Sequence, residues 1–487
     1  MHRSRKLALT ALFASVLAAC GGGGGDGTAA PASAPALGGI GTSSTNGDGV
    51  ASGAGTTTAS GSPAAAPAPS AGAPAPSPAA STPPASPPPP APAAFSAFDP
   101  VQIASNPLPF GGAVARLSDG GNVVLWVAAG DTTRDSRLMA QRTDAAGQPV
   151  GAALVVKTEV ERVTQVAVAA APDGGYLVAW AGFDAVANTP GSVVVNLMAR
   201  RYDADGTLVR ETRLVPDSQY TIGDLSVEPM PGGGFVVGWD AVSVARTAPL
   251  WGHLQRLDAD GALSGSEVDL LDTRDGQQQS KVTVVPHADG TVTAVWSNRS
   301  VESPQMFTIY TRRFDASLRP LTPPTPIDGT TQATSFFLSA AAVGSNVALA
   351  WSVPGSGSEP IRSVVIAPGA TSLGDVATVT PTTAYQLSAL KVESLGSGAY
   401  GVVWQESEFY PRGSNAYVRL QRHDASGAAT GAPTTLDGRG VSWVSDTTGF
   451  GVTAGSGIAV DAGTDGHLVV EAQFAGKTEP ELVLFGR

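Results

Sequence analysis

Apolar and polar residues alternate in short runs along most of this 487-residue chain. From Ser96 onward, runs rich in valine, leucine and tryptophan are separated by glycine, aspartate and proline turns. Alternation with a period of two places successive side chains on opposite faces of an extended strand. No segment of this region shows a competing helical period. The pattern therefore predicts an all-β domain over residues 96–487.

One hairpin recurs through this domain: a tight glycine turn leads into an apolar strand that ends in tryptophan. Copies such as "SDGGNVVLW", "PDGGYLVAW" and "PGGGFVVGW" end at Trp126, Trp180, Trp239, Trp296, Trp351 and Trp404. A seventh copy, "TDGHLVVE", ends at Glu471, where tryptophan is expected. The intervals are 54, 59, 57, 55, 53 and 67 residues, enough for about four strands each. We expect the tryptophans to pack between neighbouring units, because a large flat side chain fills such an interface well. A ladder of sugar-binding aromatic side chains is the alternative.

A second phrase, Arg-x-Asp, follows most of the tryptophans. Its arginines are Arg142, Arg201, Arg256, Arg313 and Arg422, and its aspartates are Asp144, Asp203, Asp258, Asp315 and Asp424. The aspartate begins a turn, where its carboxylate can cap backbone N–H groups. The arginine is expected to pair with a neighbouring carboxylate or carbonyl. Calcium binding at turns such as "DADG" is a weaker alternative, because no late bidentate acid follows at suitable spacing.

Seven four-strand units resemble the blades of a seven-bladed β-propeller. The seventh unit supplies three strands, and the segment "FDPVQIASN" at 98–106 precedes the first unit. This N-terminal strand can complete the seventh blade and close the ring, which would otherwise present an open edge. A β-sandwich is the competing fold, but seven units of similar length with complementary ends favour the propeller.

The first residues have the layout of an export signal, with a cationic head and an apolar run that is too short to span a membrane. The sequence "LAAC" places Cys20, the only cysteine of the chain, directly after this run. It resembles the lipobox of bacterial lipoproteins. The resemblance implies removal of a signal peptide at 1–19, acylation of Cys20 (palmitate) and a membrane partner reached through that lipid. An ordinary signal followed by an incidental cysteine is the alternative. Gly21, in place of aspartate, favours the outer membrane in a Gram-negative cell.

Residues 20–95 differ in composition from the rest, being rich in Gly, Ala, Ser and Pro with two charges. Such a segment cannot bury enough apolar surface to offset its chain entropy. We expect a disordered tether, extended in its Pro/Ala half. It would hold the domain away from its anchor in the cell envelope.

Charge and motif content exclude several functions. The formal net charge is −12 and the expected signal carries three cations, so the mature chain would stand near −15. This balance argues against nucleic acid as a partner. The five histidines show no metal-ligand spacing, and no nucleophile elbow or phosphate-binding loop is evident. We therefore predict no cofactor and no metal, and a monomer.

The glycine hairpins invite comparison with the aspartate box of sialidases, Ser-x-Asp-x-Gly-x-x-Trp. In "SDGGNVVLW" no residue separates Ser118 from Asp119, and the tryptophan stands too far from the last glycine. The spacing fails in every copy. The hairpin is therefore interpreted as structural.

The longer and more variable connections are the expected binding surface, because loops on a rigid scaffold commonly carry function. They should lie opposite the two short turns. The candidate ligand-binding residues are Asp184, Arg246, Trp251, Glu406, Glu408, Tyr410, Arg412 and Trp443. The alternative is that these are ordinary loop residues, with the two tryptophans folded back onto the blades.

The sequence favours a lipid-anchored module that binds or scaffolds an envelope protein, a peptide or a saccharide. An extracytoplasmic, glycosidase-like hydrolase is the main alternative, with Asp184, Glu406 or Glu408 as paired acids at a separation of about 5–10 Å. A purely structural envelope protein without a ligand is a third possibility.

Overall fold

The computed structural model describes residues 98–105, 112–129, 136–160, 162–185, 193–218, 220–243, 251–272, 277–300, 306–332, 337–353, 360–379, 385–408, 414–441, 458–462, 467–475 and 480–486. The expected signal, Cys20 and the whole tether lie outside these ranges, as do Arg246, Tyr410, Arg412 and Trp443. In the described ranges no helix is long and apolar enough to cross a membrane.

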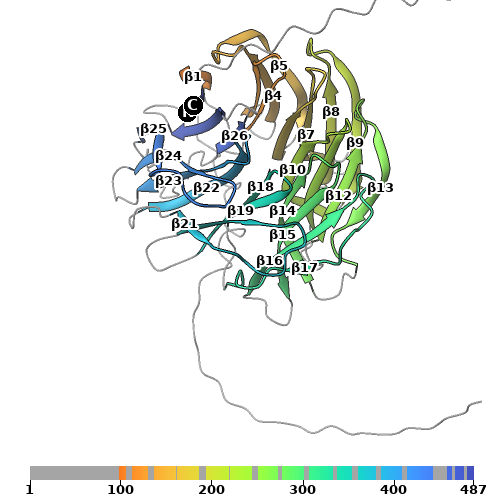
Figure 1. Ribbon diagram of the computed structural model, residues 1–487. Coiled ribbons are helices and arrows are strands. Elements are labelled where there is room, and N and C mark those ends of the chain that lie inside the picture. Colours follow the sequence, from red (N-terminus) through yellow and green to blue (C-terminus); the bar gives the residue numbers. More distant parts are fainter. Residues whose placement is uncertain are drawn as a thin grey trace, which may run out of the picture. The chain divides into compact units, whose positions relative to one another are not determined.

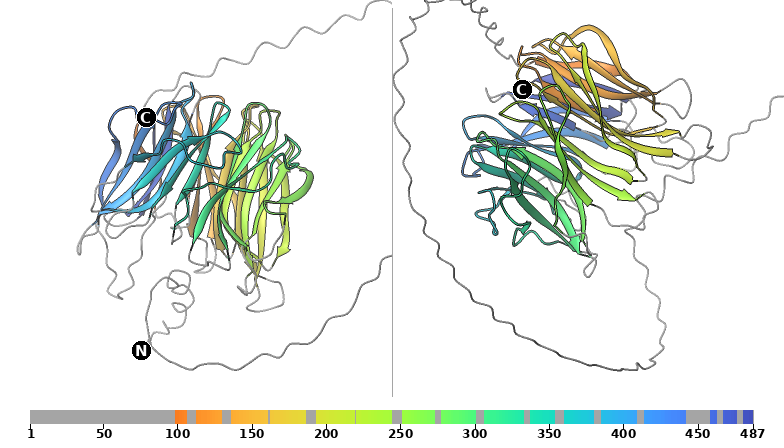
Figure 2. Two further views of the ribbon diagram at one scale, coloured as in Figure 1. Left: turned by 60° about the horizontal axis from the view of Figure 1, so that its bottom comes forward. Right: turned by 90° about the vertical axis from the view of Figure 1, so that its right-hand side faces the viewer.

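Within these ranges, seven four-stranded antiparallel sheets stand around a ring as the blades of a β-propeller (Figures 1 and 2), which confirms the predicted fold. The first strand of each blade lies beside the first strand of the next, so these strands form the inner wall. Blades 1 to 3 consist of β2 (Gly112–Arg116), β3 (Asn122–Ala129), β4 (Ser136–Thr143), β5 (Pro149–Val160); β6 (Arg162–Ala170), β7 (Tyr176–Ala185), β8 (Val193–Tyr202), β9 (Leu208–Ser218); and β10 (Tyr220–Pro229), β11 (Phe235–Ser243), β12 (Trp251–Leu257), β13 (Leu263–Asp269).

The remaining blades follow the same order. Blades 4 to 6 consist of β14 (Gln277–Pro286), β15 (Val292–Ser300), β16 (Phe307–Phe314), β17 (Thr325–Pro326); β18 (Leu338–Val343), β19 (Asn346–Ser352), β20 (Ile361–Ile366), β21 (Ala377–Val379); and β22 (Tyr385–Ser394), β23 (Tyr400–Glu408), β24 (Ser414–His423), β25 (Thr434–Val441). Blade 7 combines β26 (Ile458–Ala462), β27 (Leu468–Ala475) and β28 (Pro480–Gly486) with β1 (Phe98–Ser105).

Ring closure follows the sequence prediction. Strand β1 pairs antiparallel with β28, from Phe98 opposite Gly486 to Ser105 opposite Glu481. It supplies the outermost strand of blade 7. The edge of β28 is therefore covered by a strand from the other end of the domain.

Apolar clusters between neighbouring blades hold the ring together. Trp180 of blade 2 packs with Val123 and Leu138 of blade 1, and Trp404 of blade 6 packs with Ala350 of blade 5. The repeated tryptophans, with an exposed fraction of 6% or less, confirm the predicted packing between blades. Dry inter-blade contacts of this kind are the main favourable term for a ring without disulfides.

Blade 7 differs from the sequence prediction by one residue. Ala472, not Glu471, occupies the tryptophan position, since it pairs with the first residue of β26 as Trp126 pairs with the first residue of β2. A shift of one residue moves a side chain to the other face of a strand. Glu471 therefore faces blade 1 and is buried, and a side chain at Gly112 would collide with its carboxylate.

In blades 1 to 4 the repeated arginine joins the two short turns, which lie on the same face of the ring. Arg201 binds Asp173 of its own glycine turn at 2.6 Å and the Ala259 carbonyl of the next blade at 3.0 Å. The aspartate of the phrase caps its turn, as the carboxylate of Asp203 accepts hydrogen bonds from the backbone N–H groups of Asp205 and Thr207. Both predicted roles are confirmed.

Candidate functional site

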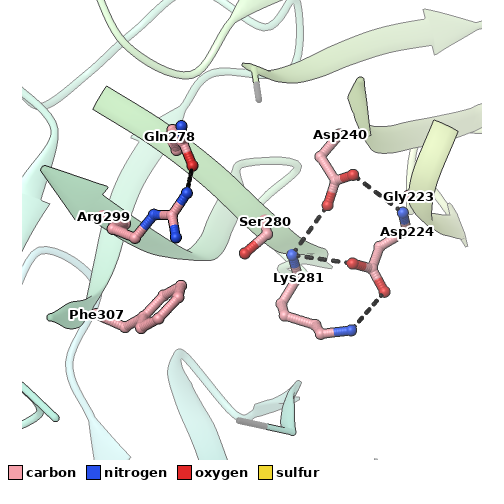
Figure 3. Close-up of a pocket in the computed structure, with 8 residues that line it drawn as sticks. All are labelled: Gly223, Asp224, Asp240, Gln278, Ser280, Lys281, Arg299 and Phe307. Atoms are coloured by element: carbon pink, nitrogen blue, oxygen red, sulfur yellow. Dashed lines mark hydrogen bonds and ion pairs between the residues drawn. The ribbon is translucent and has the colours of Figure 1, made fainter. Parts of the chain in front are cut away.

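A pocket of about 320 Å³ opens between blades 3 and 4 (Figure 3). Its walls come from the inner strands β10 and β14, from the neighbouring strands β11 and β15, and from the start of β16. The lining residues are Gly223, Asp224, Asp240, Gln278, Ser280, Lys281, Arg299 and Phe307. Acidic, basic, amide and aromatic side chains thus share one cavity.

Two bulges place the charged groups in this pocket. The register of β10 shifts between Ile222 and Leu225, and that of β14 shifts between Ser280 and Thr283. A bulge removes a residue from the regular ladder and re-aims its side chain. Lys281 in the second bulge has a φ of 60°, which costs a non-glycine residue conformational energy.

The bulges bring Asp224 and Lys281 to Asp240, which follows Trp239 on β11. The Lys281 ammonium lies 3.2 Å from an Asp224 carboxylate oxygen. The Lys281 backbone N–H lies 3.1 Å from both carboxyl groups, and the Asp224 backbone N–H donates to Asp240 at 3.2 Å. A side chain at Gly223 would collide with Asp240, so this approach requires glycine.

The two aspartates titrate in opposite directions. Burial raises the pKa of Asp240 well above its usual value, and the adjacent Asp224 charge raises it further. Burial also acts against the charged form of Asp224, but the Lys281 ammonium and several hydrogen bonds outweigh it and lower the pKa of Asp224. The charge of Asp224 in turn raises the pKa of Lys281. Because the two shifts run in opposite directions, Asp240 takes up a proton more readily than Asp224.

The opposite wall of the pocket is flat and cationic. The Arg299 guanidinium lies over the Phe307 ring, 5.5 Å from its centroid, and donates to the side-chain carbonyl of Gln278. Figure 3 shows this group beyond Ser280, across from the aspartates. The pocket can therefore offer oriented hydrogen-bond donors, a carboxylate acceptor, one exchangeable proton and a flat surface.

Of the eight predicted loop candidates, the structure describes the side chains of Trp251 and Glu406. Asp184 and Glu408 are at the ends of β7 and β23, and their side chains are outside the described part of the molecule. Trp251 is the half-buried first residue of β12, opposite Ala241. None of the candidates that the structure describes lines the pocket between blades 3 and 4.

Glu406 was expected on a variable loop, but the structure places it inside strand β23, where it is fully buried. Its carboxylate accepts a hydrogen bond from the Trp404 indole at 2.9 Å and pairs with Arg419. Strand β23 continues past its tryptophan, so the side chain points into the blade. These contacts give Glu406 a structural role in blade 6.

One residue of the pocket left a signal in the sequence. Asp240 stands directly after a repeated tryptophan, where blades 1 and 2 have Val127 and Ala181. Blades 4, 5 and 6 have Ser297, Ser352 and Gln405 there, so an acid at a position that is otherwise neutral marks a departure from the repeat. Asp224 and Lys281 left no comparable local signal, because only the bulges and the ring bring them together.

A second acidic group lies at the inner wall. Glu228, Glu393 and Asp461 are each the penultimate residue of an inner strand, in blades 3, 6 and 7. Burial and the charge of Asp461 raise the pKa of Glu228 to about 8, with Lys391 opposing the shift. Burial also raises the pKa of Asp461 to about 6 and that of Glu393 well above its usual value. The three acids therefore resist ionising together.

No protein-family model and no curated protein matches this sequence. Among solved structures, the polysaccharide lyase Uly1 is 11% identical over 80% of this chain and 99% of its own, with a TM-score of 0.49. An α-L-arabinanase of Penicillium chrysogenum complexed with arabinobiose is 13% identical, covering 63% and 94%, with a TM-score of 0.40. A protein of unknown function from Dyadobacter fermentans is 12% identical, covering 64% and 94%, with a TM-score of 0.45. At these identities the likeness concerns the fold alone.

Proposed function

We propose that the protein binds saccharide, with one sugar unit held in the pocket between blades 3 and 4. The observation that supports this most is the Asp224–Asp240–Lys281 cluster, which fixes acceptors and donors in a cavity of about 320 Å³. Sugar hydroxyls both donate and accept hydrogen bonds, so they suit such a mixed set. Small-molecule sites are commonly concave, with a few fixed polar groups and apolar or aromatic walls.

Binding can be tested by screening the propeller domain against an array of plant and bacterial polysaccharide fragments, followed by calorimetry on each hit. Asp224→Asn and Lys281→Met should each weaken binding by about tenfold or more, because a buried hydrogen bond to a charged group is worth about 1.5–3 kcal/mol. Asp289→Asn removes an exposed turn carboxylate and serves as the matched control. Equal binding by all four proteins, or no bound glycan, would overturn the proposal. Capture of an envelope protein instead would support the scaffolding alternative.

Glycoside hydrolysis at the same pocket is the second candidate, and the opposite pKa shifts of the two aspartates favour it. Asp240 as a protonated acid and Asp224 as a carboxylate supply a donor and an acceptor at one pH. Two-carboxylate glycosidases hold these groups about 5–10 Å apart. Here the carboxyl groups hydrogen-bond to each other, so the pair would have to act as one dyad that shares a proton.

Release of reducing ends from a bound glycan would separate hydrolysis from binding. Asp240→Asn should abolish release while binding persists, because the amide keeps the shape of the protonated acid but supplies no acidic proton. A polysaccharide that is bound and never cleaved by the wild-type protein would identify a binding module.

We further propose that acylated Cys20 anchors the protein in the cell envelope, at the outer membrane of a Gram-negative cell, with residues 21–95 as a tether. The lipobox-like "LAAC" and the single cysteine support this. Cys20→Ala should move the protein from the membrane to the soluble fraction and eliminate labelling by a palmitate analogue. Continued membrane retention of the variant would contradict the proposed anchor.

A further inference from the structure

The outer hairpin of blade 3 gathers three side chains that the saccharide pocket does not use. His253 of β12 stands directly opposite Asp269 of β13, and Glu267 lies two residues earlier on the same face of β13. The His253 Nδ1 atom is 2.8 Å from a Glu267 carboxylate oxygen and 3.0 Å from one of Asp269. One ligand atom from each residue lies within 4.8 Å of the other two.

Burial and an aromatic contact hold the imidazole of His253 in place. His253 is 6% exposed, and its ring stacks on Trp239 with centroids 5.4 Å apart. Its buried Nδ1 makes no well-directed hydrogen bond, although both carboxylates are close. Both carboxylates therefore contact the same ring nitrogen. Ligands 2.0–2.1 Å from a tetrahedral Zn²⁺ lie about 3.3 Å apart, so the three groups would need to separate only slightly to share a cation.

We propose that His253, Glu267 and Asp269 bind a divalent transition metal of the Zn²⁺ class. One imidazole nitrogen and two carboxylate oxygens form a mixed donor set that Zn²⁺ accepts, whereas Mg²⁺ and Ca²⁺ prefer oxygen ligands alone. Glu267 and Asp269 are 41% and 36% exposed, so the remaining coordination position faces solvent and takes water.

The metal would join β12 to β13 where their pairing is irregular. Their register shifts between Leu254 and Arg256, so the ladder loses regular pairs close to this cluster. A metal that bridges both strands would brace the outer hairpin of blade 3. This role is independent of saccharide binding, and either proposal can fail while the other stands.

A proton is the competing occupant of the same position. Burial lowers the pKa of His253, but the carboxyls of Asp269 and Glu267 outweigh burial and raise it. A protonated imidazolium would satisfy both acids without any metal. The experiment must therefore detect the metal itself.

Tag-free protein, stripped with a chelator, is titrated with Zn²⁺ by calorimetry at pH 7.5, and thermal unfolding is followed with and without the metal. We expect one Zn²⁺ per chain and a higher Tm. Co²⁺ should give the visible absorption bands of a bound ion. His253→Gln should abolish binding, and Glu267→Gln should weaken it by more than the roughly 10–100-fold that loss of an outer-shell partner costs.

Glu211→Gln is the matched control, because Glu211 is an acid on the outer strand of blade 2 that pairs with Arg200 and not with a histidine. It should leave zinc affinity unchanged. His253→Gln and Glu267→Gln must unfold cooperatively without metal, so that lost binding reports on the ligands. Absence of zinc binding by folded wild-type protein, unchanged affinity in both ligand variants, or a preference for Ca²⁺ over Zn²⁺ would overturn the proposal.

Discussion

Asp224 and Asp240 are chemically the same residue, but the pocket shifts their pKa values in opposite directions. Both accept the Lys281 backbone N–H, but Asp224 also contacts the Lys281 ammonium, whereas Asp240 is deeper and has a carboxylate for a neighbour. Burial without a compensating cation favours the neutral acid, and a salt bridge favours the anion. The position of each carboxyl group relative to the Lys281 ammonium therefore decides which aspartate holds a proton more readily.

The two asparagine variants of this pair should differ in stability. Burial favours the neutral form of Asp240, and Asp240→Asn supplies a neutral group of the same shape, so the free energy of unfolding at pH 7 should change by less than about 1 kcal/mol. Asp224→Asn leaves the half-buried Lys281 ammonium without its anion and should cost about 1–3 kcal/mol. Urea unfolding measures both variants. Equal losses would show that the proton is not localised on Asp240.

At the scale of single residues, the sequence predicts the structural roles of repeated residues better than those of unrepeated ones. The packing of tryptophan, the capping by aspartate and the pairing of arginine are confirmed, because each recurs with its own local context. The expectation for Glu471 was wrong by one position, because most of the tryptophans stand six residues after the turn glycine, as Trp180 does after Gly174, and the same count from Gly466 gives Ala472.

Between elements, the repeated arginines of blades 1 to 3 each tie their blade to the one that follows. Arg142 pairs with Asp119 at 2.8 Å and also donates to the Ala204 carbonyl of blade 2. Arg201 makes the same two kinds of contact but is nearly fully buried, with its guanidinium over the Phe235 ring of blade 3. The same motif therefore contributes differently according to burial.

Arg201→Ala should lower the free energy of unfolding by about 1.5–3 kcal/mol, since it leaves buried carbonyls without their charged donor. Arg142→Ala, at a more exposed pair, should cost less than about 1 kcal/mol. Arg201→Lys should recover only part of the loss, because an ammonium cannot reproduce the planar fork of the guanidinium. Guanidinium chloride unfolding of the three variants provides the comparison. Similar values for Arg142→Ala and Arg201→Ala would contradict this dependence on burial.

The order of the strands could be predicted from the repeat, but their ends could not. Segments expected to be loops after Trp180 and Trp404 begin as continuations of β7 and β23. The bulges that place Asp224 and Lys281 have no signature in their own residues. They depend on how two inner strands fit against each other in the ring, and this fit is a property of the assembled sheets.

At the scale of the whole molecule, closing seven blades into a ring brings acids of distant blades to one inner wall. Glu228 and Asp461 are far apart in the sequence, and they belong to different blades, so neither acid meets the other within its own blade. In the ring the charge of Asp461 adds to burial in raising the pKa of Glu228 to about 8. Assembly itself therefore makes stability depend on pH.

The pKa of Glu228 in the folded state is above its usual 4.5, so the folded state binds the additional proton. This contribution to stability is complete below about pH 4.5 and is lost as the pH rises through 8. Glu228→Gln should remove that loss. Between pH 5 and 8, the free energy of unfolding of the Glu228→Gln variant should rise by more than about 1.4 kcal/mol relative to that of the wild type. This amount corresponds to one pKa unit, which is less than the full shift of Glu228 because solvent screens part of the effect. Urea titrations at several pH values test this, and parallel pH curves for the two proteins would contradict it.

Removal of residues 96–106 should destabilise the whole domain, because β28 would lose its partner and blade 7 its outer strand. Ile103→Asp is a milder test, since Ile103 packs against the cluster shared by blades 7 and 1. Both variants should lower Tm in differential scanning calorimetry, with the deletion having the larger effect. An unchanged Tm in the deletion variant would contradict the role of β1 as the closing strand.

The pairing of β1 with β28 joins a strand that is made early to the strand that is made last. Phe98 emerges from the ribosome before any blade exists, but its partner Gly486 is made only after all six complete blades. Until then β1 has no native partner, and its backbone groups remain available to any other open edge. Closure of the ring by β1 therefore requires that the C-terminal strand of blade 7 has already been made.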